Sequence, residues 1–158
     1  MSKSGKKAVK LINTFRITIP ANQAAPAPPL GPALGQKGVN LGKFCKEFNE
    51  RTSHFIDGAP IPTDIDVYSD RSFKMVTRQP ITAWFLKNAA GIEKGAARAS
   101  HEIVGRVNIK QIYEIARIKQ KNNIQMEMQS LEEICGMIIR QAWRMGLDVV
   151  DETKEMQA

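Results

Sequence analysis

The run of proline and glycine at residues 28–40 constrains the fold of this chain more than any other feature. It reads PPLGPALGQKGVN and places three prolines and three glycines within eleven positions. Proline fixes φ and lacks an N–H donor, so no long continuous helix can pass through the segment. Glycine lets another surface approach the backbone closely. The segment is therefore stiff, small-faced and nearly uncharged, which suits contact by shape and supplies no nucleophile, acid or base.

The charge balance of the whole chain indicates what kind of partner such a segment meets. The 158 residues carry a formal net charge of +7, with 42% hydrophobic and 25% charged residues. This composition is typical of a globular protein with one domain or two small ones. An excess of basic residues favours nucleic acid or another anionic surface as the partner. On charge alone, a basic protein with ordinary solvated faces fits equally well.

The N-terminal third contains segments that resemble membrane and targeting signals. Residues 17–36 carry no charge, but five prolines interrupt them, so no spanning helix and no membrane partner are expected. Eight basic residues precede the first acid, Glu47, as in a mitochondrial transit segment. Residues 9–19 nevertheless alternate apolar and polar side chains, so we predict that the tract is retained as structure. No secretory signal is visible. The two cysteines, Cys45 and Cys135, lack zinc-ligand spacing and are predicted to be reduced.

The first half of the chain predicts a small α/β unit. Residues 9–19 are predicted to form a strand, and 20–38 a loop with a short helical turn after Pro32. Asn40 is a plausible N-cap for an amphipathic helix, because apolar residues follow it at helical spacing. Alternating patterns on either side of a turn at residues 69–71 predict a β-hairpin.

The second half predicts a three-helix unit with short strands. Thr82 is expected to cap a short first helix, and Asn108 with Gln111 a second one, after a glycine- and alanine-containing loop from Gly91 to Gly105. Residues 119–129 read as polar and irregular.

A capping box begins the third helix at Ser130, and Gly146 ends it as a C′ glycine. Residues 147–150 are expected to add a strand. The predicted fold class is therefore α+β. The predicted limits are 1–76 for the N-terminal α/β domain, 77–82 for the linker, 83–152 for the C-terminal helical domain and 153–158 for a tail.

Enzyme and cofactor motifs are missing from the sequence. The glycines at 31, 35 and 38 do not have dinucleotide-binding spacing, and no phosphate-loop motif is present. His101-Glu102 begins like a zinc-protease helix, but position 105 is glycine where the second histidine is required. We therefore expect no catalytic residue, no metal and no cofactor.

A polyproline ligand is an alternative function for the opening run, since residues 26–32 contain two P-x-x-P matches. Such ligands usually lie in disordered tails, whereas this run stands between a strand pattern and a helix pattern. An ordered loop is favoured, and an adaptor protein that displays polyproline without binding RNA is the second hypothesis.

The basic residues of the second half suit phosphate contacts. They lie on or near each predicted helix and in the loop between the first two helices. Long cations on one side of a helical unit can follow a phosphate backbone. The pattern does not establish that the helix faces converge, so ordinary solvated faces remain an equal alternative. The residues concerned are Lys87, Lys94, Arg98, Lys110, Arg117, Lys119, Lys121, Arg140 and Arg144.

Several motifs, in order along nearly the whole chain, closely resemble the family of large-subunit ribosomal protein eleven. The proline- and glycine-rich run is the most specific of these motifs. The others are Phe44-Cys45-Lys46-Glu47-Phe48-Asn49, Val67-Tyr68-Ser69-Asp70-Arg71-Ser72-Phe73, Leu86-Lys87-Asn88-Ala89-Ala90-Gly91-Ile92-Glu93-Lys94-Gly95 and Met145-Gly146-Leu147-Asp148-Val149-Val150-Asp151.

The resemblance implies a non-enzymatic protein at the base of the ribosomal stalk. Its C-terminal domain is expected to bind the GTPase-associated region of large-subunit rRNA, near stalk ribosomal proteins. Its N-terminal domain is expected to present a proline helix to a cleft against the RNA, where translational GTPases dock and thiazole-peptide antibiotics bind. The implied rRNA-binding residues are Lys87, Gly91, Lys94, Arg98, Lys119, Arg140, Gln141, Arg144 and Met145. The implied cleft residues are Pro28, Pro29, Gly31, Pro32 and Gln36.

The sequence departs from the family pattern on the last helix. The family usually has small residues there, Gly-Thr-Ala-x-Ser, whereas this chain has Arg140-Gln141-Ala142-Trp143-Arg144. Longer side chains then replace close backbone packing, or the RNA differs locally. Residues 112–119 and 49–52 look more like mitochondrial members than bacterial ones. With the acid-free N-terminus, this favours a ribosome of the mitochondrial matrix over the bacterial cytoplasm.

Overall fold

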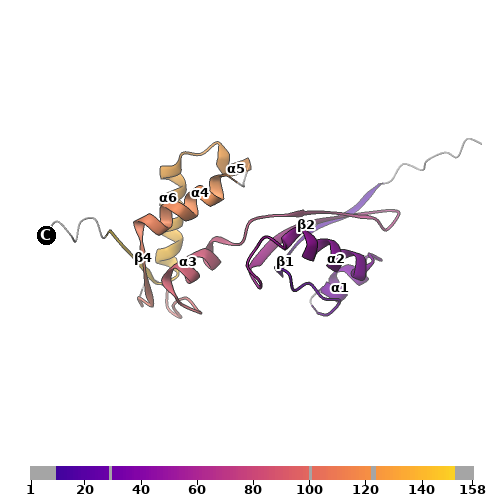
Figure 1. The fold of residues 1–158 in the computed structure, drawn as a ribbon, viewed down its shortest axis with the longest axis horizontal. Coiled ribbons are helices and arrows are strands. Elements are labelled where there is room, and N and C mark those ends of the chain that lie inside the picture. The colour runs from indigo at the N-terminus through magenta and orange to yellow at the C-terminus, as the bar shows by residue number, and fades with distance from the viewer. Residues whose placement is uncertain (1–9, 29, 100, 122–123, 152–158) are drawn as a thin grey trace, which may run out of the picture. The chain divides into compact units, whose positions relative to one another are not determined.

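The chain divides into two compact units, Met1–Arg78 and Gln79–Ala158. The computed structural model describes residues 10–28, 30–99, 101–121 and 124–151 (Figure 1). The mixture of helices and strands confirms the predicted α+β class.

Unit 1, the first of these, is built on a three-stranded antiparallel sheet in the order β1-β2-β3. The strands are β1 (Leu11–Pro20), β2 (Pro60–Tyr68) and β3 (Phe73–Thr77). β2 alternates strictly between buried and half-buried residues, because one face of the sheet is covered and the other is not. The predicted hairpin and N-terminal strand are confirmed, except that Val9 lies outside the described residues.

Two helices pack against the covered face of this sheet, α1 (Leu30–Gly35) and α2 (Leu41–Thr52) (Figure 1). The Asn40 side chain accepts a hydrogen bond from the Lys43 N–H and so caps α2, as predicted. Phe44 of α2 is fully buried and meets the Phe73 ring edge-on, with ring centroids 5.5 Å apart. This aromatic contact joins α2 to β3.

The predicted helical turn after Pro32 is wrong in position, because α1 begins at Leu30 and contains Pro32. Proline is tolerated in the first turn of a helix, where its missing N–H has no intrahelical partner in any case. Leu30 and Leu34 are both buried on the inner side of α1. These two leucines, one helical turn apart, fix the helix to unit 1.

Unit 2 contains α3 (Thr82–Ala90), α4 (Ile109–Lys121), α5 (Ile124–Glu127) and α6 (Leu131–Arg144). Its core brings together one apolar face from each long helix and two strand residues. The buried members are Leu86, Val107, Ile112, Ile115, Ala116, Ile134, Ile138, Ala142 and Leu147. The three predicted helices are confirmed as α3, α4 and α6. The predicted irregular stretch 119–129 is wrong where α4 continues to Lys121 and where α5 forms.

A two-stranded parallel sheet completes unit 2, with β4 (Gly105–Asn108) paired to β5 (Leu147–Val150). The strand at 147–150 is confirmed, whereas the sequence pattern predicts no strand at β4: it gives Gly105 to the loop and Asn108 to the cap of the next helix. β4 has four residues, of which only Val107 is fully buried. Such a short segment shows no alternation of buried and exposed side chains that would predict a strand. This strand is defined by its partner, which lies about forty residues later in the chain.

The helix caps of unit 2 differ from the prediction at one of three N-termini. At α4 the Asn108 N–H donates to the Gln111 side chain and the Asn108 side chain accepts from the Lys110 N–H, as predicted. Ser130 and Glu133 form the predicted capping box at α6. The prediction that Thr82 caps α3 is wrong, because the N-cap is Ile81 and no side-chain bond is made there. Ile81 has an extended backbone, with φ −61° and ψ 144°, and Pro80 disfavours a helical conformation at the residue before it.

Replacing Ser130 by Ala should lower the free energy of unfolding by about 1 kcal/mol, because it leaves an N–H at the start of α6 without its partner. The Thr82→Ala variant is the matched control and should change stability much less. Thermal unfolding and amide exchange at α6 measure both. Equal losses in the two variants would contradict the assigned caps.

Candidate nucleic-acid interface

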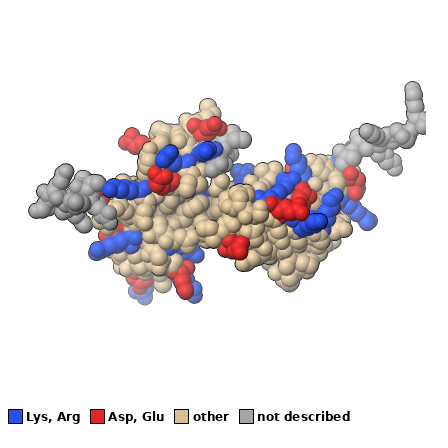
Figure 2. All heavy atoms as spheres, in the orientation of Figure 1, with Lys and Arg blue, Asp and Glu red and all other residues tan. Residues whose placement is uncertain are grey.

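Net charge does not by itself locate a binding surface on this molecule. On the face drawn in Figure 2, basic and acidic side chains are interspersed over both units. The candidate interface must therefore be found from the local geometry of the predicted residues.

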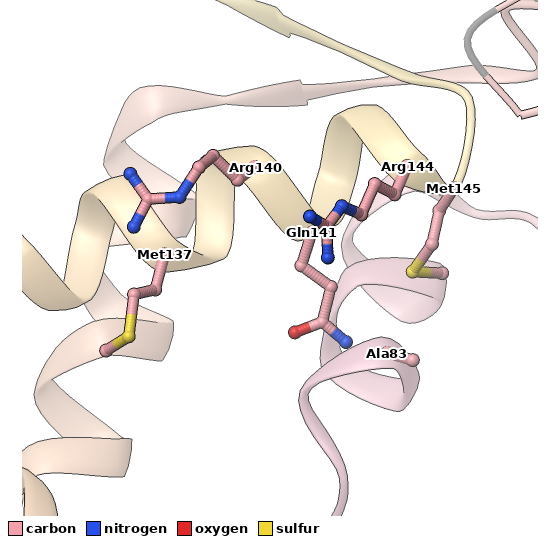
Figure 3. A pocket seen from close by; sticks show the side chains of 6 residues that line it. All are labelled: Ala83, Met137, Arg140, Gln141, Arg144 and Met145. Atoms are coloured by element: carbon pink, nitrogen blue, oxygen red, sulfur yellow. The ribbon is translucent and has the colours of Figure 1, made fainter.

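A groove of about 530 Å³ lies between α6 and the start of α3, and four predicted rRNA-binding residues line it. Figure 3 shows Arg140 and Arg144 extending from α6, with Gln141 directed towards Ala83 of α3. The full lining is Ala83, Met137, Arg140, Gln141, Arg144 and Met145. The helix period accounts for the clustering, because positions 137, 140, 141 and 144 fall on one face of an α-helix.

Both arginines of this groove are exposed, and neither forms an ion pair with a described carboxylate. Their guanidinium groups are therefore available, in the described part of the chain, for planar bidentate contacts to phosphate. The groove presents two guanidinium groups, an amide and a thioether. These groups suit contact with an anionic backbone rather than catalysis.

The loop between α3 and β4 is bonded to the C-terminal end of α6. The N–H of Ala96 donates to the Met145 carbonyl at 2.9 Å, and the N–H of Val104 donates to the Gly146 carbonyl at 2.8 Å. Gly146 has φ +76°, and a Cβ there would lie 2.5 Å from both Ala96 Cβ and the Glu102 carbonyl oxygen. Only glycine fits this position without a local shift.

This attachment brings the basic loop residues to the same end of unit 2 as the groove. Lys94 and Arg98 are exposed and stand two residues on either side of Ala96, whose N–H bonds to Met145. Gly91 has φ +66° and reverses the chain as the C-cap of α3. Lys87 is half-buried and donates from Nζ to the Glu93 carbonyl at 3.3 Å, so it bridges α3 and the loop.

Lys119 is the predicted rRNA-binding residue that the structure does not bring to this surface. It is only 8% exposed, and its Nζ donates to the Pro80 carbonyl. The ammonium also lies 5.5 Å from the centroid of the Phe85 ring. Burial lowers the pKa of Lys119 from 10.5 to about 8. Within unit 2 this side chain fixes the segment that leads into α3.

The proline segment of unit 1 presents a second, uncharged surface. Pro28, Pro32 and Gln36 are exposed, and Gly31 is half-buried, while Pro29 lies outside the described residues. The ammonium of Lys37 lies 3.5 Å from the centroid of the Phe15 ring, in a cation–π contact with β1. The predicted cleft residues therefore stand together on and beside α1.

Sequence reasoning missed two residues of the groove, Met137 and Ala83. Met137 could have been found, because it lies one helical turn before Arg140 and Gln141 on the same face. Ala83 carries no such signal, since it reaches the groove only through the packing of α3 on α6.

The described residues contain no group of three or more His, Cys, Asp or Glu side chains that could hold a metal ion. Cys45 and Cys135 are free, and burial raises the pKa of both thiols. Within the described ranges, no helix has both the length and the apolar composition needed to cross a membrane.

Comparison with known families matches both units. Residues 15–73 match the family described as ribosomal protein L11, N-terminal domain, and residues 78–149 match ribosomal protein L11, RNA binding domain. The groove and the attached loop both lie within the second match.

Individual relatives cover most of the chain. A Caenorhabditis elegans protein named large ribosomal subunit protein uL11m is 45% identical over 91% of this chain and 74% of its own length. Large ribosomal subunit protein uL11 of Roseobacter denitrificans is 43% identical over 90% and 99%, respectively. The Drosophila melanogaster uL11m protein is 41% identical over 95% and 78%.

The match to an RNA binding domain and the ribosomal relatives define the class of this chain as an RNA-binding, non-enzymatic protein. The chain belongs to the ribosomal protein L11 family. The hypothesis of a polyproline-displaying adaptor without RNA finds no support in these matches.

The buried Lys119 gives a prediction for stability against pH. Its pKa is about 8 in the folded protein and 10.5 ordinarily, so the unfolded chain binds more protons between these values. This side chain therefore makes stability rise as pH increases from about 8 to 10.5. In Lys119→Met that contribution to the rise should be lost.

Chemical denaturation of wild type and variant at matched pH values measures this effect. Lys121→Met, which changes an exposed lysine of α4, is the control and should keep the wild-type rise. If Lys119→Met follows the wild-type pH profile throughout, the ammonium is not buried as described.

Proposed function

We propose that this protein is a constituent of the large ribosomal subunit whose unit 2 binds the GTPase-associated region of the rRNA at the stalk base. The observation that carries the proposal is the attachment of the 91–104 loop, which holds Lys94 and Arg98, to Met145, a residue that lines the groove of Arg140 and Arg144. Folded RNA is recognised through shape, 2′-hydroxyls and phosphates, which such a surface contacts directly.

The proposed rRNA contacts follow from this geometry. Arg140 and Arg144 bind phosphates at the groove, and Lys94 and Arg98 bind phosphates from the loop. Gln141 and Met145 contact the RNA backbone that lies in the groove. Lys87 and Gly91 set the shape of the loop. Lys119 contributes from inside unit 2 by holding Pro80.

The proposed role of unit 1 is different. Its exposed prolines carry no charge, so they contribute contact area and shape rather than electrostatic attraction. We assign this face to the neighbourhood of translational GTPases and stalk proteins, and to the thiazole-peptide antibiotic cleft that the family resemblance implies. The relatives named uL11m support a mitochondrial ribosome, and we propose the mitochondrial matrix as the location.

Binding to a transcript of the GTPase-associated region tests the basic surface. In the full chain, Arg144→Ala and Lys94→Ala should each weaken binding and reduce the slope of log K against log salt by about 1, because each removes a phosphate contact. Lys46→Ala, an exposed lysine of α2 in unit 1, removes the same charge and should leave the slope unchanged. Unchanged slopes in both unit 2 variants would refute the contacts.

Antibiotic and factor responses test the proline surface. Pro28→Ser and Pro32→Ser should alter thiazole-peptide sensitivity or factor-dependent GTP hydrolysis on reconstituted ribosomes, while rRNA affinity changes less than twofold. The control is Pro26→Ser, an exposed proline that the resemblance does not place in the cleft. A collapse of rRNA affinity in the first two variants would contradict the division of roles between the units.

A further inference from the structure

A second hollow lies at the end of α6, apart from the basic groove. It has a volume of about 160 Å³. One wall comes from the loop before β4 and the other from the α6–β5 junction. Its lining is His101, Glu102, Ile103, Trp143, Gly146, Leu147 and Asp148. We call this hollow the Trp143 pocket.

Two large apolar side chains line the pocket and remain open to solvent. Trp143 is 68% exposed and Ile103 is 72% exposed. Trp143 also stands between Arg140 and Arg144 in sequence, and both arginines line the neighbouring groove. An exposed aromatic ring beside cations that follow a phosphate backbone is the arrangement on which proteins stack unpaired bases.

The charges of the pocket distinguish a base from a phosphate. Glu102 and Asp148 both line it, and the Asp148 carboxylate lies 3.9 Å from the Arg106 guanidinium. Ionised carboxylates accept hydrogen bonds and repel phosphate. They suit the N–H groups on the edge of a nucleobase. The phosphates then lie outside the pocket, where Arg140 and Arg144 have no ion-pair partner among the described residues.

The backbone holds the two walls of the pocket in place without a ligand. The bond from the Val104 N–H to the Gly146 carbonyl joins the loop to the α6–β5 junction next to the lining residues. Because Gly146 has no Cβ, the Glu102 carbonyl can approach it closely. A site with fixed walls does not spend binding free energy on ordering itself.

We propose that the Trp143 pocket holds one unstacked base of the rRNA, with the Trp143 ring against the base face and the Glu102 or Asp148 carboxylate accepting from its N–H edge. This assignment rests on the proposed rRNA-binding function of unit 2. It gives a role to the tryptophan that stands in this chain's departure from the small-residue pattern of the family.

Substitution of Trp143 in the full chain tests the stacking contact, with the transcript of the GTPase-associated region as probe. Trp143→Ala should bind about 5- to 150-fold more weakly, the range expected for loss of one base–aromatic stack. The salt slope should stay at the wild-type value, because stacking releases no counterion. Trp143→Phe should recover part of the loss. Tyr113→Ala is the control, since it removes an aromatic ring of α4 that is 44% exposed and lies outside the pocket.

Tryptophan fluorescence reports the same contact directly. In Trp84→Phe the remaining tryptophan is Trp143, whose emission should be quenched as the transcript saturates the protein. Wild-type affinity in Trp143→Ala, or unquenched emission at saturation, would overturn the base pocket while leaving rRNA binding intact. Unquenched emission at saturation would indicate instead that the pocket binds an apolar side chain of a neighbouring protein. If the wild-type chain does not bind the transcript at all, the proposed function itself fails.

Discussion

The backbone attachment of the 91–104 loop to the end of α6 is the constraint on which the rest of unit 2 depends. Two hydrogen bonds, to the carbonyls of Met145 and Gly146, fix a loop whose described residues form no strand or helix. They require a left-handed glycine, because any Cβ at Gly146 would meet the loop backbone. Without this junction, the loop cations and the helix cations would have no defined separation, and the Trp143 pocket would lack its second wall.

The two units use opposite physical means to present a surface. Unit 2 places flexible cations such as Arg140 and Arg144 around a groove, so its contacts strengthen at low ionic strength. Unit 1 buries Leu30 and Leu34, leaves rigid prolines outside and turns Lys37 onto Phe15. Binding at a surface of this second kind depends on complementary shape and changes very little with salt concentration. In the proposed function, one chain therefore combines an anchor that depends on charge with a face that depends on complementary shape.

The sequence predicted elements whose signals are local and missed features that depend on packing. The helix that starts at Asn40 and the capping box at Ser130 follow from short-range side-chain chemistry, and both are confirmed. β4 could not be predicted, because its only partner is a distant parallel strand. Lys119 reads as an ordinary basic residue of a helix face, and its burial follows from where Pro80 and Phe85 lie. The convergence of the basic residues was left open, since sequence spacing places residues on helix faces but does not orient one helix against another.

The parallel pairing of β4 with β5 has a consequence for the order of events during synthesis. The carbonyls of residues 145 and 146 fix the loop, and the strand at 147–150 pairs with β4, which follows the loop. The ribosome makes all of these residues long after the loop itself. Helices α3 and α4 can form as the chain is produced, whereas closure of the long segment between the two strands must wait. In a nascent chain the loop that carries Lys94 and Arg98 is therefore attached to the end of α6 only in a late step, after residues 145–150 have been made.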